Sequence, residues 1–331
     1  MVSCRNKVDK KTENEEMIFG TKSHTVESVI DLTQILKNDD EIITVSIDKE
    51  GINTLIIHSA PKYRTENGMF AVIKSEQPKN YTFIQHDFKG NEVFKTVIKN
   101  EYFNFHNVNF LPTNEILLIC GRSRYKSETE IDKNARIYNS SGELSREFVV
   151  GDGIQDVKID TKGNIWTSYF DEGTYGNYGW NNPIGTSGLI CWNKEGKKIW
   201  EFEPTDGLDH ISDCYAMNID LENNTWFYYY TEFPLVKLSD SKQIDFWGTK
   251  IEGSSSLNIS DNKILMADGY DSNNFVLFEI NGKKLKKSKK IKFQSKEGIE
   301  LNKQNYITSF GSNIGFRNEN KIYLTNVSEI K

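Results

Sequence analysis

The sequence is poor in several features that mark common functional classes. It has 6 prolines and 4 cysteines in 331 residues, and the cysteines form no Cys-x-x-Cys pair, so a zinc knuckle is not expected. No apolar run approaches the roughly 18 residues of a membrane-spanning helix, so no transmembrane segment is expected. The net charge of −6 argues against a nucleic-acid footprint, so no nucleic-acid partner is predicted.

The chain also lacks the short motifs of well-known enzyme classes. It has no His-Glu-x-x-His, no Walker loop, no Gly-x-Ser-x-Gly and no Gly-x-Gly-x-x-Gly between a strand and a helix. Nucleophilic catalysis by serine or cysteine therefore has no support from motifs. Cys120, Cys191 and Cys214 lie in strand-like segments, where we expect buried free thiols.

The first residues differ in character from the rest. Residues 1–16 are polar and charged without periodicity, so we expect a disordered tail followed by a single domain over residues 17–331. No apolar signal segment precedes Cys4, which favours a cytoplasmic protein. The alternative is a lipid-anchored or exported protein trimmed at Cys4, because a charged run follows that cysteine.

A β-hairpin pattern recurs six times along the chain. Two apolar residues at i and i+2 are followed by a polar turn, an asparagine and an apolar strand start, which is typical of two antiparallel strands. Successive copies begin 63, 49, 60, 40 and 57 residues apart. The copies are Val45/Ile47 with Leu55, Val108/Phe110 with Ile116, Val157/Ile159 with Ile165, Met217/Ile219 with Trp226, Leu257/Ile259 with Ile264, and Ile314/Phe316 with Ile322.

A second pattern follows most copies. An aromatic strand end, a glycine turn and a further apolar strand recur, as from Trp192 through Gly196 to Trp200. Each repeat therefore holds about four strands, and repeats of this length are typical of propeller blades. We predict an all-β, six-bladed β-propeller of four-stranded antiparallel blades. A seven-bladed ring is the first alternative, and a β-sandwich or β-solenoid with coincidental spacing is the second.

The sixth copy ends shortly before Lys331, so its blade lacks two strands. The segments near residues 17–36 are the only unassigned apolar ones, although their period does not distinguish a helix from a strand. We predict that they complete the last blade and close the ring, which hides the open sheet edges and suits a monomer.

In a propeller, the loops that enter each blade and the loops that follow its second strand open on the same face. Here these loops are rich in aromatic residues and in charges of both signs, whereas most turns at the other end are plain glycine and asparagine turns. This asymmetry predicts a pocket for a small polar or anionic ligand, or a partner protein. The predicted ligand-binding residues are His106, Arg122, Arg124, Asp156, Tyr169, Asp171, Trp180, Asp213, Tyr215 and Tyr230.

Aromatic and basic residues have distinct expected roles in that pocket. Tyr169, Trp180 and Tyr215 would form its apolar walls. Arg122 or Arg124 would pair with an anionic group, because a guanidinium suits bidentate contact with a carboxylate or phosphate. The structural alternative for the Trp180 loop is a packed lid over the channel.

The acidic residues suggest a second, enzymatic hypothesis. Asp156, Glu172 and Asp213 would orient polar groups or hold a divalent cation such as Ca²⁺ or Mg²⁺. Such a cation would polarise a carbonyl group, with Glu172 or His210 as the catalytic base. The structural alternatives are that the aspartates cap backbone amides and that His106 and His210 are hydrogen-bonded loop residues.

Part of the chain resembles known propellers. GIQDVKIDTKGNIWTSY (153–169) looks like a blade of the NHL, SMP-30 and streptogramin-lyase class. SYFDEG (168–173), GNYGW (176–180), SGL (187–189) and SDCYAMNID (212–220) resemble, in this order, motifs of an uncharacterised bacterial propeller family. The resemblance covers about residues 150–235 and implies the fold rather than an activity.

The better-known propellers of that class suggest the chemistry of the alternative. SMP-30 relatives are metal-dependent lactone hydrolases, and streptogramin lyases use a histidine base with Mg²⁺. No ligand set of this chain aligns with theirs residue by residue, and neither His106 nor His210 matches a motif. The resemblance therefore implies a metal-dependent hydrolase or lyase only by analogy of fold.

Overall fold

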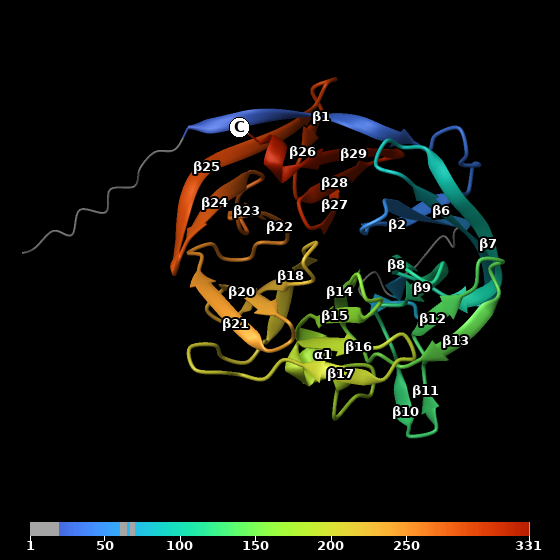
Figure 1. Ribbon diagram of the computed structural model, residues 1–331. Helices are drawn as coiled ribbons and strands as arrows, with labels where there is room; N and C mark the ends of the chain where they lie inside the picture. Colours follow the sequence, from blue (N-terminus) through green and yellow to red (C-terminus); the bar gives the residue numbers. More distant parts are fainter. Residues whose placement is uncertain (1–19, 60–64, 67–69, 331) are drawn as a thin grey trace, which may run out of the picture.

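The chain folds into β-sheets that stand around a central axis in a propeller-like ring (Figure 1). The computed structural model describes residues 20–59, 65–66 and 70–330. The predicted tail, residues 1–16 with Cys4, lies outside the described residues. The fold is all-β and consists mostly of four-stranded antiparallel sheets, which confirms the predicted class and strand content.

Four sheets have four strands each, paired in chain order. They are β2 (Glu41–Ile47), β3 (Ile52–His58), β6 (Lys74–His86) and β7 (Glu92–Phe103); β8 (Asn107–Leu111), β9 (Glu115–Ile119), β12 (Ala135–Tyr138) and β13 (Leu144–Phe148); β14 (Ile154–Ile159), β15 (Ile165–Tyr169), β16 (Leu189–Trp192) and β17 (Lys198–Glu201); and β18 (Asp213–Ile219), β19 (Thr225–Tyr230), β20 (Pro234–Ser239) and β21 (Gln243–Gly248). Two small hairpins, β4–β5 (Thr65–Glu66, Phe70–Ala71) and β10–β11 (Tyr125–Ser127, Glu130–Ile131), lie in loops.

A nine-stranded sheet joins the two ends of the described chain. Its strands are β22 (Leu257–Ser260), β23 (Lys263–Ala267), β24 (Phe275–Asn281), β25 (Lys284–Ser295), β1 (Thr21–Asp31), β29 (Lys321–Asn326), β28 (Asn313–Asn318) and β27 (Tyr306–Phe310), with β26 (Glu300–Leu301) on β25. β1 pairs in parallel with β25 and antiparallel with β29. The N-terminal strand is thus held between two strands from the C-terminal part of the chain (Figure 1).

Five of the six predicted hairpins are the first two strands of a four-strand group. They correspond to β2–β3, β8–β9, β14–β15, β18–β19 and β22–β23. The sixth predicted hairpin is β28–β29, which forms the second and third strands of its group. The first strand is β27, which is joined to β28 through Gly311 and Ser312. The prediction that the last repeat lacks two strands is therefore wrong. The C-terminal chain supplies three strands, so only one is lacking, and β1 pairs with the third strand, β29.

Aspartates order the turns between first and second strands. Asp220 Oδ1 accepts the backbone N–H groups of Glu222 (3.1 Å) and Asn224 (2.8 Å), and its Oδ2 accepts the Asn224 amide (2.8 Å). The indole N–H of Trp226 donates to the same Oδ2 at 2.8 Å. Asp160 is bonded to its own turn in the same way. In three of the six repeats, the asparagine that marks the repeat in sequence thus donates its side-chain amide to the turn aspartate, as Asn53, Asn164 and Asn224 do.

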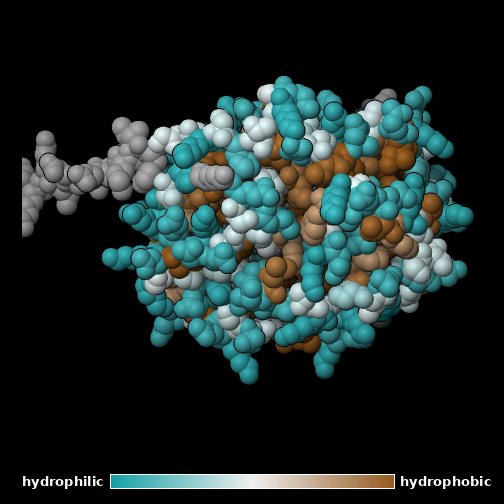
Figure 2. All heavy atoms as spheres, turned by 45° about the horizontal axis from the view of Figure 1, so that its top comes forward, coloured by the Kyte–Doolittle hydropathy of each residue, from teal (hydrophilic) through white to brown (hydrophobic). Residues whose placement is uncertain are grey.

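The hydrophobic core lies between neighbouring sheets. Leu117 of the second sheet packs with Val157 and Ile165 of the third, and Trp226 of the fourth packs with Ile264 of the next group. Most side chains visible in the space-filling view are hydrophilic, with hydrophobic groups showing between them (Figure 2). Each group of strands therefore buries its faces against its two neighbours rather than alone.

The helical content is small. The described residues contain α1 (Asp171–Tyr175) and two short 3₁₀ helices, η1 (Ile184–Ser187) and η2 (Val327–Glu329). None of them has the length and apolar character that crossing a membrane requires. Cys120, Cys191 and Cys214 are buried and free, which confirms the prediction for these thiols.

Candidate functional site

The loops that the sequence singled out meet at one end of the sheets. Antiparallel pairing places the start of each first strand beside the end of the second, so Ile154 pairs with Tyr169. In the next sheet, Asp213 pairs with Tyr230. Neighbouring sheets are linked at this end, where the Ile154 N–H donates to the Gly121 carbonyl at 2.9 Å. We call this end of the ring the loop face.

A polar cavity of about 180 Å³ lies among the first strands and the segment before β22, and we call it the axial cavity. An engineered cavity of about 150 Å³ in another protein holds benzene, so the axial cavity has room for a molecule of that size. Hydroxyl, amide and charged groups dominate its lining. The lining includes Thr44, Asn109, Asp156, Lys158, Tyr215, Ser256 and Thr308.

Lys158 is the cationic group of the axial cavity. It stands two residues after Asp156 on β14, so both side chains leave the strand on the same side. Lys158 is only 3% exposed, and its Nζ lies 3.3 Å from Asp156 Oδ2. A charged group out of water requires a partner, and Asp156 partly fills this need from a half-buried position. The prediction of Asp156 at the pocket agrees with this placement, whereas Lys158 was missed.

The helix α1 carries acidic residues to the neighbouring β18. The Thr174 hydroxyl donates to the Ser212 carbonyl at 2.7 Å, which ties α1 to the start of that strand. Burial raises the pKa of Asp213 to about 6, and the negative charge of Asp171 adds to the effect. Asp171 itself is exposed and accepts the N–H of Glu172. Asp171 and Asp213, far apart in sequence, thus interact on the loop face.

Two glycines, Gly153 and Gly173, allow α1 to pack closely against the segment that enters β14. A Cβ on Gly153 would lie 2.3 Å from the Gly173 nitrogen, and a Cβ on Gly173 would lie 2.7 Å from the Gly153 carbonyl oxygen. Gly153 also has a φ of 68°, which side-chain-bearing residues rarely adopt. The DEGTY helix can therefore lie directly on the segment that enters β14.

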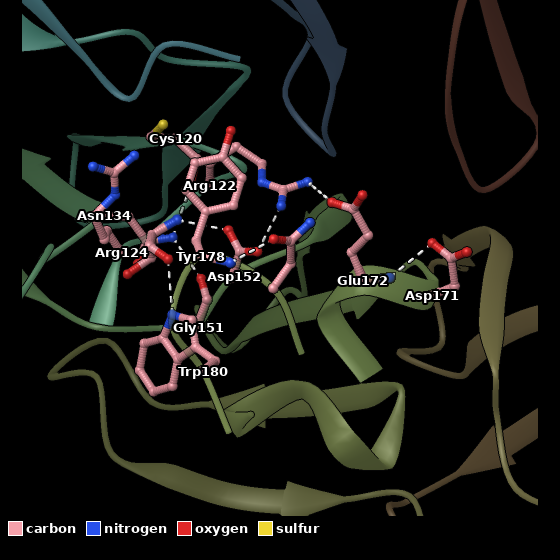
Figure 3. A network of polar contacts seen from close by, with 12 residues as sticks. Cys120, Arg122, Arg124, Asn134, Gly151, Asp152, Asp171, Glu172, Tyr178 and Trp180 are labelled. Atoms are coloured by element: carbon pink, nitrogen blue, oxygen red, sulfur yellow. Dashed lines mark hydrogen bonds and ion pairs between the residues drawn. The ribbon is translucent and has the colours of Figure 1, made fainter. Parts of the chain in front are cut away.

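Arg122 is held by two carboxylates (Figure 3). Its Nη2 lies 2.8 Å from Asp152 Oδ2, and its Nη1 lies 2.5 Å from Glu172 Oε2. The ring centroid of Tyr178 lies 4.3 Å from the guanidinium carbon. The prediction that Arg122 receives an anionic ligand is therefore not supported, because protein carboxylates already occupy both of its terminal nitrogens.

Asp152, the buried partner of Arg122, was missed in the sequence. Its side chain is fully buried, and Oδ1 accepts the Ser123 N–H at 2.8 Å. Burial raises its pKa to about 6, although the charge of Arg122 acts in the opposite direction. Desolvation therefore outweighs the ion pair. Little in the sequence indicates this role, because Asp152 stands between two glycines, a pattern that is typical of an ordinary turn.

Arg124 and Trp180 both contact the polypeptide on the other side of the junction between the segment after β9 and the loop after β15. Arg124 is exposed, with its guanidinium carbon 5.5 Å from the Tyr178 ring centroid. The Trp180 indole is 7% exposed and donates to the Ser123 carbonyl at 2.8 Å. Its ring lies 5.1 Å from that of Tyr125. Trp180 thus fastens the long loop after β15 over the chain that follows β9, which agrees with the packed alternative rather than with a ligand wall.

Tyr169 is not available to a ligand. It has no exposed surface, it lies in the core between the second and third sheets, and its hydroxyl donates to the Val150 carbonyl at 2.6 Å. Tyr169 is the last residue of an entirely buried strand, and its ring points into the core rather than the pocket. The predicted role as a pocket wall is therefore not supported.

The two predicted histidines have local hydrogen bonds. His106 Nδ1 accepts the Gly121 N–H at 3.0 Å. His210 is exposed, with Nδ1 3.0 Å from Asp209 Oδ1 and Nε2 3.5 Å from the Tyr175 hydroxyl. Glu172, the other predicted catalytic residue, is engaged by Arg122. Each of these three side chains thus has a partner in the protein, which for the two histidines matches the structural alternative.

The predicted metal ligands do not converge. Over the described ranges 20–59, 65–66 and 70–330, no group of three or more histidine, cysteine, aspartate or glutamate side chains is placed to hold a metal ion. Asp156 pairs with Lys158 and Glu172 with Arg122. The proposed set of Asp156, Glu172 and Asp213 therefore lacks a common centre.

An aromatic cluster extends outward from the axial cavity, and we call Tyr215, Tyr230, Phe233 and Tyr270 the aromatic rim. The Tyr215 and Tyr270 hydroxyls are 2.6 Å apart, and the Phe233 ring lies 5.5 Å from Tyr230 and 5.9 Å from Tyr215. Tyr215 also lines the axial cavity. The predicted residues Tyr215 and Tyr230 are thus brought together with Phe233, from the loop that follows Tyr230, and with Tyr270, from the loop between β23 and β24.

Comparisons with known proteins bear mainly on the fold. Residues 189–325, less than half of the chain, match the family model of the YxzG family. No curated protein matches the sequence. A solved streptogramin B lyase structure has a TM-score of 0.48 at 9% identity, covering 91% of this chain and 97% of that one.

Two further structures give similar values. Virginiamycin B lyase from Staphylococcus aureus has a TM-score of 0.43 at 12% identity, with 86% of this chain and 97% of that chain covered. A chain of the mitotic checkpoint complex has a TM-score of 0.48 at 8% identity, with 98% of each chain covered. Proteins with such different roles share only a distant likeness of fold with this chain, and no activity follows from it.

Proposed function

We propose that this chain is a six-bladed β-propeller that binds a small polar ligand with an anionic group in the axial cavity, reached from the loop face. The observation that carries the ligand proposal is Lys158, a buried cation at the cavity wall with a single carboxylate nearby. The Lys158 ammonium has three N–H donors, and a bound anion would accept those that are not directed at Asp156, whose Oδ2 lies at 3.3 Å.

The count of six blades is supported by the order of strands. Four groups of four strands follow one another along the chain, and β22–β25 form a fifth. β27–β29 supply three strands of a sixth group, to which β1 adds the fourth through antiparallel pairing with β29. First strands or the segments that lead into them line the axial cavity in every group, which is the arrangement expected of six blades around one axis.

The cavity lining supports a ligand that is polar rather than apolar. Thr44, Asn109 and Ser256 are buried polar residues that line the cavity. The Thr44 hydroxyl lies 2.8 Å from that of Tyr306 and the Ser256 hydroxyl donates to Asn258, and each hydroxyl oxygen has a further lone pair with which it can accept from a ligand hydroxyl. We do not advance the metal-dependent hydrolase or lyase alternative, because its proposed ligands have other partners or lack a common centre.

The test is a ligand screen of the full chain by thermal unfolding. A panel of small carboxylates, phosphate and sulfate is added, because a ligand that binds only the folded state raises Tm. We expect Lys158→Met to abolish the rise given by any active anion. We expect Asp156→Asn to enlarge it, because the competing carboxylate is removed while Lys158 remains. Titration calorimetry of the active anion then measures both effects as changes in Kd.

Lys162→Met provides the matched control, because Lys162 is an exposed lysine in the turn of the same sheet. It should respond to anions as the wild type does. The proposal fails if no anion of the panel stabilises the wild type, or if Lys158→Met folds and binds the active anion unchanged.

A further inference from the structure

The aromatic rim combines two exposed rings, Tyr230 and Tyr270, with two half-buried ones, Tyr215 and Phe233. Tyr270 is 51% exposed and Tyr230 is 47% exposed. Exposed tyrosines close together are uncommon without a binding role, because each leaves apolar ring surface in water. The rim begins at the axial cavity, since Tyr215 belongs to both.

Tyr270 is fixed in place from three sides. Its backbone N–H donates to the Glu252 carbonyl at 3.1 Å, and the Lys303 ammonium donates to its carbonyl. One ring face covers Gly253, where a Cβ would lie 2.2 Å from a ring carbon, so only glycine allows this approach. The hydroxyl bonds to Tyr215 at 2.6 Å. The exposed part of the ring is therefore a rigid surface that loses little conformational entropy when a ligand binds.

We propose that the aromatic rim stacks against the apolar face of a sugar ring, so that the ligand of the loop face is a carbohydrate. The axial C–H bonds of a pyranose form an apolar face whose hydrogens carry partial positive charge, and the negative face of an aromatic ring attracts them. The hydroxyls at the edge of the same sugar need hydrogen-bond partners, and the carboxylate of Asp213 and the lining of the axial cavity lie beside Tyr215.

The surroundings of the rim favour a carbohydrate over a peptide. A proline-rich peptide would lie along an extended aromatic groove. Here the aromatic surface instead borders a cavity of about 180 Å³ lined by hydroxyls and amides, which suits one polar ring entering edge-first. The acidic side chains Asp171, Asp213 and Glu232 on the same face are good acceptors for sugar hydroxyls. This inference rests on the proposed ligand cavity.

The test measures sugar binding to the full chain by saturation-transfer NMR and calorimetry. The probes are glucose, galactose, N-acetylglucosamine, glucuronate and short oligomers of each. We expect at least one probe to bind with saturation strongest on the protons of its apolar face. Tyr270→Ala and Tyr230→Ala should each weaken binding at least tenfold, whereas Tyr270→Phe should retain most of it because the ring remains.

Tyr102→Ala is the matched control, because Tyr102 is 48% exposed on the outer strand β7 of the first sheet and belongs neither to the aromatic rim nor to the lining of the axial cavity. It should bind sugars as the wild type does. Binding of a peptide library member but of no sugar would overturn the carbohydrate assignment, as would unchanged sugar binding in folded Tyr270→Ala and Tyr230→Ala.

The same variants separate this inference from the proposed function. If no sugar binds while small anions still stabilise the wild type and not Lys158→Met, the carbohydrate inference fails and the cavity proposal stands. If sugars bind through the rim while no anion of the panel stabilises the wild type, the anion-binding proposal fails and the carbohydrate inference stands.

Discussion

At the scale of single residues, burial and pairing decide which charges a ligand can use. Arg122 looked like the anion-binding group, but Asp152 and Glu172 hold both of its terminal nitrogens. Lys158 was not singled out in the sequence, yet it is buried at the axial cavity with the Asp156 carboxylate 3.3 Å away. The lysine is the better candidate for a ligand contact because its charge is the less completely satisfied.

The buried carboxyl of Asp152 predicts a pH dependence of stability. Its folded pKa of about 6 lies above the ordinary aspartate value. Such a group contributes stability below its unfolded pKa, and this contribution is lost as the pH rises through the folded pKa. As the pH rises from about 4 to 7, we expect Asp152→Asn to gain about 1–3 kcal/mol in free energy of unfolding relative to the wild type, because the variant lacks this loss. Urea unfolding over this pH range measures it.

The control for this prediction is Asp261→Asn, which changes an exposed turn aspartate. It should keep the wild-type pH dependence. Asp213, whose pKa is also raised to about 6, contributes a fall of the same sign in both variants. A pH profile of Asp152→Asn identical to that of the wild type would show that Asp152 is ionised alike in the folded and unfolded chain.

At the scale of elements, hydrogen bonds from aspartate side chains determine the local structure of several turns between strands. Three turn aspartates, Asp87, Asp160 and Asp220, accept the backbone N–H groups two and four residues ahead. Only local spacing is needed for this arrangement, so it is readable from sequence. Asp87 accepts the same hydrogen bonds in the turn between β6 and β7, the two outer strands of the first sheet.

Removal of the Asp220 carboxylate should destabilise the fold markedly. It accepts four hydrogen bonds, one of them from the buried indole of Trp226. We expect Asp220→Ala to lower the free energy of unfolding by about 2–4 kcal/mol, because the indole N–H is left buried and unpaired. Asp87→Ala, at a more exposed turn without a tryptophan partner, should cost less than half as much. Urea unfolding of both variants decides this, and equal losses would contradict the role of the indole.

At the scale of the whole molecule, closure depends on a strand from the other end of the chain. β1 bonds to β29 and β25, and the His24 ring lies 3.0 Å from the Thr325 hydroxyl. Val26 and Ile30 of β1 are buried in two different core clusters. Without β1, both β25 and β29 would present open edges.

The buried side chains of β1 should therefore matter as much as those of central strands. We expect Ile30→Ala to lower the free energy of unfolding by about 2–4 kcal/mol, through lost burial and the cavity left behind. Thr25→Ala, which changes an exposed residue of the same strand, should have little effect. Thermal and urea unfolding test both, and an Ile30→Ala variant as stable as the wild type would mean that β1 is not an integral strand.

The sequence by itself determined the local features of this protein. Alternating apolar residues and turns with aspartate, asparagine and glycine define strands and hairpins through contacts within a few residues, and five of six predicted hairpins were placed correctly. It also indicated that Asp156, Tyr215 and Tyr230 belong to the loop face.

Only the tertiary structure decided which of those side chains are free to act. Tyr169 is taken into the core, Arg122 is neutralised by Asp152 and Glu172, and Lys158 becomes a cavity residue. The sixth predicted hairpin forms the second and third strands of its group rather than the first two. Its last strand, β29, pairs with β1 from the other end of the described chain. Burial and pairing depend on neighbours that the ring brings from distant segments, and a pattern read along one strand carries no information about them.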